Sequence, residues 1–197
     1  HKRIIFNGNG YDESWLAEAE ARGLSNLKTT PEALSAFLTE KNIKLFTKNG
    51  VYTEKELESR HEIFLENYAK TINIEALTMI DLVNRQIVPA VVSYENELAG
   101  LYRSKGEAGG FDNTFECDLL RKISILAASL ARKLSKLEEE TVAVRGIADS
   151  SELAAAYRER VFSAMNELRA VVDELELTVA AKYWPLPSYG EILYSVI

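Results

Sequence analysis

The stretch from Glu54 to Arg103 contains one proline and one glycine, and this scarcity of helix breakers limits the fold more than any other feature. Its apolar residues recur at helical spacing, which predicts a single helix about 75 Å long at 1.5 Å per residue. Pro89 lies inside the stretch, where we expect it to kink the helix or split it in two. A compact globule of 197 residues would be only about 40 Å across, so an elongated architecture is indicated.

Two more helical segments follow, and each carries an apolar seam of coiled-coil type. We expect Thr114 to cap the first, which ends at Gly146, and Asp149 to open the second, which Pro185 and Pro187 terminate. Long helices joined by short loops must pack antiparallel. The seams are Leu119, Ile123, Leu126, Leu130, Leu134 and Leu137 in the first segment, and Leu153, Tyr157, Val161, Ala164, Leu168, Val171, Leu175 and Val179 in the second.

The first 52 residues show a different pattern, made of short elements. Lys2–Phe6 predicts a short strand, and the turn signal Asn7–Gly10 follows it. Short helices are predicted over Glu13–Arg22, Pro31–Leu38 and Glu40–Lys48. These elements form an arm that leads into the long helices.

Several of the predicted helices have recognisable end signals. Asp12 and Thr30 are expected N-caps, and Gly23 is expected to stop the first helix. Thr53 and Glu56 have the spacing of a capping box in front of the long helix. A last short helix is predicted over Tyr189–Ser195.

We therefore predict an all-α fold: an elongated antiparallel bundle of three long helices plus short N-terminal helices. Residues 1–52 form the arm, and residues 53–197 form the bundle with its aromatic C-terminal tail. The single strand has no partner strand, and the chain starts at His1 rather than Met. We expect the strand to belong to a domain outside this chain and the chain to be part of a longer protein.

Composition removes several classes of function. The net charge of −7 and the pI of about 5.1 argue against nucleic acid or an anionic membrane as the main partner. No apolar run approaches the roughly 18 residues of a membrane span, and there is no signal peptide. A single Cys excludes a disulfide framework and a cysteine zinc site. We expect a cytoplasmic protein with neither a nucleic acid nor a membrane as partner.

Two short motifs come near to known sites and then depart from them. Gly8 and Gly10 follow the predicted strand, but the third small residue of a dinucleotide-binding turn is replaced by Glu13, so we interpret the motif as a tight turn that needs positive φ. His61 opens a zinc-protease-like sequence, but the second His is replaced by Leu65. We expect His61 to be partly exposed.

Other candidates have simple structural explanations. Three glutamates at four-residue spacing could bind a hard cation, but a solvated face paired with basic neighbours explains them better. The glutamates are Glu58, Glu62 and Glu66, and the neighbours are Lys55, Arg60 and Lys70. We interpret Glu138–Glu140 as a solvated charged run and Cys117 as a buried apolar residue. The aromatic segment Tyr183–Tyr189 is expected to plug the end of the bundle or to make a subunit contact. We assign no catalytic, cofactor-binding or metal-binding residue.

Four longer strings carry a resemblance to a known family. They are Lys2–Tyr11, Leu27–Leu34, Glu66–Met79 and Tyr183–Tyr189, and the first and third are the most specific. They resemble the C-terminal part of type III glutamine synthetases, the large bacterial class, and the resemblance runs from about Lys2 to Val196.

The resemblance implies that the intact enzyme joins ammonia to glutamate with ATP and magnesium, through a γ-glutamyl phosphate. It also implies a large ring-shaped homo-oligomer, with the chain's own catalytic domain and other subunits as partners. The family's metal-binding glutamates and phosphate-contacting arginines lie in motifs that precede this region, so no residue is carried over. ATP and Mg are expected in that upstream domain, with no cofactor in this part.

Two classes of function remain for this part of the enzyme. The seam helices favour a structural or oligomerisation module without catalytic residues. The alternative is a regulatory module that binds an effector or a partner protein.

Overall fold

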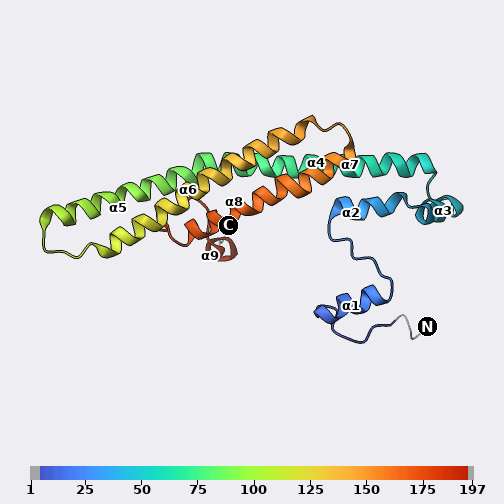
Figure 1. Cartoon of the computed structure of the whole chain (residues 1–197), viewed down its shortest axis with the longest axis horizontal. Helices are drawn as coiled ribbons and strands as arrows, with labels where there is room; N and C mark the ends of the chain where they lie inside the picture. Colours follow the sequence, from blue (N-terminus) through green and yellow to red (C-terminus); the bar gives the residue numbers. More distant parts are fainter. Residues whose placement is uncertain (1–4, 195–197) are drawn as a thin grey trace. The chain divides into compact units, whose positions relative to one another are not determined.

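The computed structural model describes residues 5–194, which form helices and loops with no strand (Figure 1). The chain divides into two compact units, residues 1–61 and 62–197. We call residues 5–53 the arm and residues 62–194 the bundle. The boundary predicted at residues 52 and 53 falls at the start of helix α4 (Glu54–Leu82), whereas the units divide inside that helix. No helix of residues 5–194 is both long and apolar enough to cross a membrane.

Helix α1 (Glu13–Ala21) has the ends that its sequence predicts. The Asp12 carboxylate accepts a hydrogen bond from the Ser14 amide at 2.8 Å, and Gly23 follows the helix with a φ of 75°. This positive φ suits glycine, which has no Cβ to clash. Of the predicted strand, Lys2–Ile4 lies outside the described residues, while Ile5 and Phe6 have irregular backbone. A strand needs a neighbouring strand to pair its backbone groups, and residues 5–194 supply none.

The second part of the arm contains α2 (Thr30–Ser35), the 3₁₀ turn η2 (Ala36–Leu38) and α3 (Glu40–Lys48), close to the predicted helices. The prediction that Thr30 caps α2 is wrong. Thr29 is the cap, because it stands three residues before Glu32 and completes a capping box with it.

Beyond Thr53 the backbone stays helical as far as Ala108. Thr53 and Glu56 form the predicted capping box, with the Thr53 amide 2.7 Å from Glu56 Oε2. Helix α4 passes through one π-helical turn, η3 (Val83–Ile87), into α5 (Val88–Ala108). Pro89 therefore does not split the helix. An α-helical proline ring would collide with the carbonyl four residues earlier, and the wider π turn directly before it is a known means of relieving such crowding.

The return helix is α6 (Thr114–Ala143), followed by the 3₁₀ turn η4 (Val144–Gly146). The residue at its N-cap is Asn113, not the predicted Thr114, and the side chain that accepts a backbone hydrogen bond there belongs to Asp112. Five of its six seam residues are buried, and Leu119 is half-buried against the same core. The seam prediction is confirmed.

The last rod consists of α7 (Ser150–Ala156), a π turn η5 (Tyr157–Val161) and α8 (Phe162–Glu176), with Asp149 as its N-cap. It ends at Glu176, earlier than the prediction from Pro185. Burial explains the early end, because the residues after it turn inward and Val179, Tyr183 and Trp184 pack against the core. Six of the eight predicted seam residues are buried, and Leu153 and Val171 are half-buried against the core. Helix α9 (Tyr189–Tyr194) is the predicted final helix within the described residues.

The bundle is an antiparallel arrangement of three rods. Within it, the α4–α5 rod (turquoise to green in Figure 1), α6 (yellow to gold) and the α7–α8 rod (orange) lie along each other, and the chain reverses direction from each rod to the next. Their apolar faces share one core, which includes Ile87, Ile123, Leu137 and Leu168. The all-α antiparallel bundle predicted from the sequence is confirmed.

Candidate functional site

The glycine turn in front of α1 is a capped helix start. The Asn9 side chain accepts a hydrogen bond from the Tyr11 amide at 3.1 Å, and Asp12 already occupies the helix N-terminus with its carboxylate. The hydrogen bond from Ser14 lowers the pKa of Asp12. The prediction of positive φ at Gly8 and Gly10 is wrong. Gly8 is needed for space, since a Cβ there would lie 2.3 Å from Phe6 Cζ.

The glutamates on α4 do not gather into a metal centre. No group of three or more His, Cys, Asp or Glu side chains within residues 5–194 is placed to hold an ion. Glu66 pairs with Lys70 at 2.7 Å, as predicted, whereas the Arg60 guanidinium lies 4.6 Å from the centre of the Tyr52 ring. His61 is half-buried, in agreement with the predicted partial exposure.

Glu138 and Glu139 are exposed, as predicted for a solvated run, but two glutamates of this run also contact other helices, which the sequence did not indicate. Glu140 pairs with Arg160 at 2.6 Å, and Glu138 accepts a hydrogen bond from the side-chain amide (Nδ2) of Asn84 at 3.3 Å. The basic residue Arg160, in the η5 turn of the last rod, was the available signal for the Glu140 pair. Cys117, predicted to be buried, is half-buried in the first turn of α6.

The aromatic tail packs back onto α5, in agreement with the predicted packing role. The Lys182 ammonium lies 2.8 Å from a Glu97 carboxylate oxygen, and the Tyr183 hydroxyl donates a hydrogen bond to the same carboxylate. These two donors lower the pKa of Glu97. The Tyr183 ring lies 5.7 Å from the Tyr94 ring, and Trp184 packs against the core. The tail thus forms part of the bundle.

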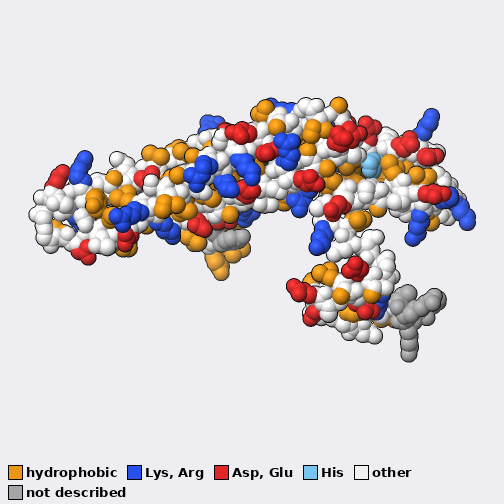
Figure 2. All heavy atoms as spheres, viewed as in Figure 1, with side chains coloured by type: hydrophobic (Ala, Val, Ile, Leu, Met, Phe, Trp, Pro, Cys, Tyr) orange, Lys and Arg blue, Asp and Glu red, His pale blue; other side chains and the backbone are white. Residues whose placement is uncertain are grey.

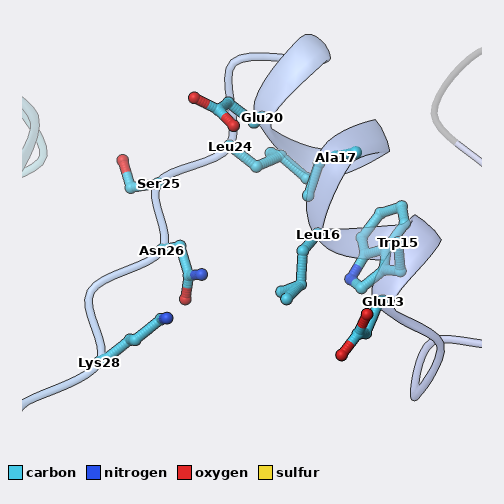
Figure 3. Close-up of a pocket in the computed structure, with 10 residues that line it drawn as sticks. Glu13, Trp15, Leu16, Ala17, Glu20, Leu24, Ser25, Asn26 and Lys28 are labelled. Atoms are coloured by element: carbon cyan, nitrogen blue, oxygen red, sulfur yellow. The ribbon is translucent and has the colours of Figure 1, made fainter.

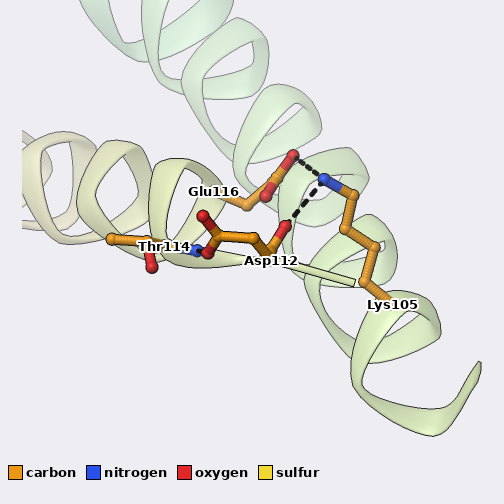
Figure 4. Close-up of polar contacts among 4 residues, drawn as sticks. All are labelled: Lys105, Asp112, Thr114 and Glu116. Atoms are coloured by element: carbon orange, nitrogen blue, oxygen red, sulfur yellow. Dashed lines mark hydrogen bonds and ion pairs between the residues drawn. The ribbon is translucent and has the colours of Figure 1, made fainter. Parts of the chain in front are cut away.

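A second polar group fixes the turn between α5 and α6 (Figure 4). The Lys105 ammonium lies 2.6 Å from Glu116 Oε1 and 3.3 Å from the Asp112 carbonyl oxygen. Glu116 is only 6% exposed, and the adjacent Lys105 lowers its pKa. Sequence reasoning did not single out this pair, although a Lys near the end of one helix and a Glu in the first turn of the next were visible.

The arm contains an open concavity of about 910 Å³ beside α1 (Figure 3). Helix α1 forms one wall and the segment Leu24–Lys28 forms the other. Leu16 projects into the space between the walls, Glu13 and Glu20 lie along the helix, and Lys28 extends from the opposite wall. The lining thus combines apolar and charged side chains; we call Leu16, Ala17 and Leu24 the floor, and Glu13, Glu20 and Lys28 the rim.

A stack of side chains packs beside α1, and one of its members, Trp15, also lines the concavity. The Phe6 and Trp15 rings lie 4.2 Å apart, and the Arg22 guanidinium lies 5.7 Å from the Phe6 ring. The guanidinium is oriented by Glu18, whose Oε1 lies 2.6 Å from Arg22 Nε.

No side chain of residues 5–53 is buried. Leu16 is 50% exposed and Leu24 is 53% exposed, even though they form the floor of the concavity. Fully burying a leucine side chain is worth about 1.5–3 kcal/mol relative to leaving it in water. The arm therefore offers a surface that gains free energy by being covered.

Comparison with known proteins shows similarity along the chain. The sequence profile of the glutamine synthetase C-terminal domain matches residues 1–105. The chain is 39% identical, over its whole length, to a glutamine synthetase of Butyrivibrio fibrisolvens. Over 98% of its length it is 34% identical to a type-3 glutamine synthetase of Dictyostelium discoideum and 32% identical to a glutamine synthetase of Bacteroides fragilis (strain YCH46).

The matches confirm the resemblance found in the sequence and place it within longer proteins. The chain spans 28% of the Butyrivibrio protein and 27% of each of the other two. The profile covers the arm, α4 and most of α5, which is more than half of the chain. The chain therefore belongs to the glutamine synthetase C-terminal domain family.

Proposed function

We propose that this chain is the C-terminal domain of a glutamate–ammonia ligase. The intact enzyme joins ammonia to glutamate with ATP and Mg through a γ-glutamyl phosphate, and its catalytic residues lie outside this chain. The names of three relatives support the activity, and the family's name supports the position of this part. We place the enzyme in the cytoplasm, where ATP and glutamate are available.

Within that enzyme we propose a structural and oligomerisation role for the domain. One observation carries this proposal: the bundle has a complete core, whereas residues 5–53 have no buried side chain. A segment of short helices with accessible apolar residues needs a surface to pack on. The arm would pack on the enzyme's own catalytic domain, and the bundle would contact other subunits of a large homo-oligomer.

The test compares the full-length enzyme with a form that ends at His61. We expect the shortened enzyme to lose the size of the native assembly in light scattering, with a corresponding fall in glutamine formation, because subunit contacts are removed. Retention of both assembly and activity would contradict the structural role. Retained assembly with lost response to a metabolite would instead support the regulatory alternative.

The isolated chain provides a second test. It should form no glutamine from glutamate, ammonia and ATP, and it should bind no ATP in a calorimetric titration. Glutamine formation by the isolated chain would contradict the assignment of catalysis to the preceding domain.

A further inference from the structure

We propose that the concavity beside α1 binds one segment of the preceding part of the same polypeptide, in which an apolar side chain is flanked by Lys or Arg. This inference rests on the proposed function, in which the arm packs on the catalytic domain. It adds the place of the contact and the chemistry of the segment that fills it.

The floor of the concavity selects an apolar group. Leu16 and Ala17 from α1 and Leu24 from the opposite wall form it, and Leu16 points into the open space (Figure 3). A volume of about 910 Å³ is large enough for several side chains. An aliphatic or aromatic side chain placed there would remove both leucines from water.

The rim selects basic neighbours for that group. Glu13 and Glu20 line the concavity, and neither carboxylate has an ion-pair partner among residues 5–194. Glu18, on the other face of the same helix, is already paired with Arg22. Two unpaired carboxylates beside an apolar floor favour a segment that brings Lys or Arg, while Lys28 can pair with an acidic residue on the opposite side.

Local hydrogen bonds define the shape of the concavity. The Gly23 and Leu24 amides donate to the Glu20 and Ala19 carbonyls at 2.9 Å, which places Leu24 over the end of α1. On the other wall, Glu32 Oε2 accepts from the Lys28 and Thr29 amides at 3.1 Å. These bonds join Leu24 to the end of α1 and Lys28 to the start of α2, so that both residues border the same space.

Charge and chain length favour the preceding polypeptide over a second copy of the bundle. Residues 1–61 hold nine Lys and Arg against nine Asp and Glu, so the net charge of −7 lies in residues 62–197. An acidic bundle is a poor partner for Glu13 and Glu20. The matched relatives, in contrast, have about 72% of their length outside the matched region. A tethered segment also binds at a high effective concentration.

Photo-crosslinking in the full-length enzyme tests the contact. Leu16 is replaced by p-benzoylphenylalanine, and the matched control carries the same probe in place of Leu45, which is 53% exposed and does not line the concavity. From position 16 we expect one dominant crosslink, within the same polypeptide, to a peptide that precedes this chain and has an apolar residue beside Lys or Arg. Crosslinks from position 16 to residues 62–197 of another copy, or none at all, would overturn the inference.

Charge reversal tests the rim. In the probe-carrying enzyme, the double substitution Glu13→Lys with Glu20→Lys should lower the crosslink yield from position 16 about tenfold, because the basic neighbours would then be repelled. Glu40→Lys, outside the concavity, should leave the yield unchanged. An unchanged yield in the double variant would overturn the proposed chemistry.

The control position separates this inference from the proposed function. If position 45 crosslinks to the preceding polypeptide and position 16 does not, the arm packs there through another face, and only the assignment to the concavity fails. If neither position crosslinks to the preceding polypeptide, the proposed packing of the arm fails as well.

Discussion

The arm and the bundle are both helical, but different interactions hold their helices. In the bundle, seam residues from three rods form one apolar core. In the arm, no side chain of residues 5–53 is buried. Asp12 and Thr29 cap α1 and α2, and the Phe46 ring lies 5.9 Å from Phe37 and 5.7 Å from Tyr52. Isolated helices shorter than about 12–15 residues are marginal in water. The difference shows that capping and local ring contacts can accompany short helices, whereas the bundle is held by a shared core. The buried residue Leu57, at 0% exposure, lies beyond the arm, in the first turn of α4.

The ion pairs follow the same division. In the arm they join residues within one helix, such as Glu18 with Arg22 and Glu40 with Lys44. In the bundle several join different helices, including Glu167 of α8 with Lys136 of α6. Pairs within a helix strengthen that helix, whereas pairs between helices strengthen the assembly of the rods.

The largest expected difference comes from core truncation. Leu168→Ala removes a side chain with 0% exposure and should lower the free energy of unfolding of the bundle by about 3 kcal/mol. Leu16→Ala in the arm, in the isolated chain, should change it by less than about 0.5 kcal/mol. Denaturant unfolding monitored by circular dichroism measures both. Equal losses would show that the arm shares the core of the bundle and would break the comparison.

Cap removal should produce a smaller difference. Asp149→Ala takes away the side chain that accepts hydrogen bonds from the Ser151 and Glu152 amides, and should cost the bundle about 1 kcal/mol. Asp12→Ala removes the equivalent cap of α1 and should leave bundle unfolding unchanged in the isolated chain. If both variants lower bundle stability alike, the arm unfolds together with the bundle.

The smallest effect is expected from pH. The Lys133 and Lys136 ammonium groups lower the pKa of Glu167 from 4.5 to about 2. Because the folded pKa is below the ordinary value, the pairing stabilises the bundle above about pH 4.5, and the stabilisation is lost as the pH falls towards 2. The difference in melting temperature between wild type and Glu167→Gln should therefore disappear over that range. Glu40→Gln in the arm should match the wild type throughout, and a constant deficit of Glu167→Gln down to pH 2 would contradict the assignment.

The bundle was largely predictable because periodic apolar spacing determines which face is buried. The seams of α6 and of the α7–α8 rod were correctly identified, and Asp149 and Thr53 were correctly placed at helix starts. The π turn before Pro89 was not predicted, since the sequence shows that a proline interrupts the hydrogen bonding but not how the helix adapts. The early end of α8 was missed because it depends on Trp184 reaching a core that only the fold creates.

The concavity of the arm was not predicted. Its two walls come from α1 and from the irregular segment after Gly23, and no periodic pattern reports how far apart such walls lie. Leu16, Leu24 and the two rim glutamates were visible in the sequence as ordinary members of a short helix and its flank. Their exposure could not be predicted, because it depends on the fact that no other part of residues 5–53 covers them in the structure.

The central claim is that the rest of the enzyme completes the arm. Hydrogen–deuterium exchange, followed by mass spectrometry on the isolated chain and on the full-length enzyme, tests it most directly. In the isolated chain we expect bundle amides to be protected and the amides of residues 5–53 to exchange rapidly. In the full-length enzyme the amides of α1 should exchange at least about 100-fold more slowly, because the arm is then covered. Equal exchange of α1 in the two proteins would contradict the claim.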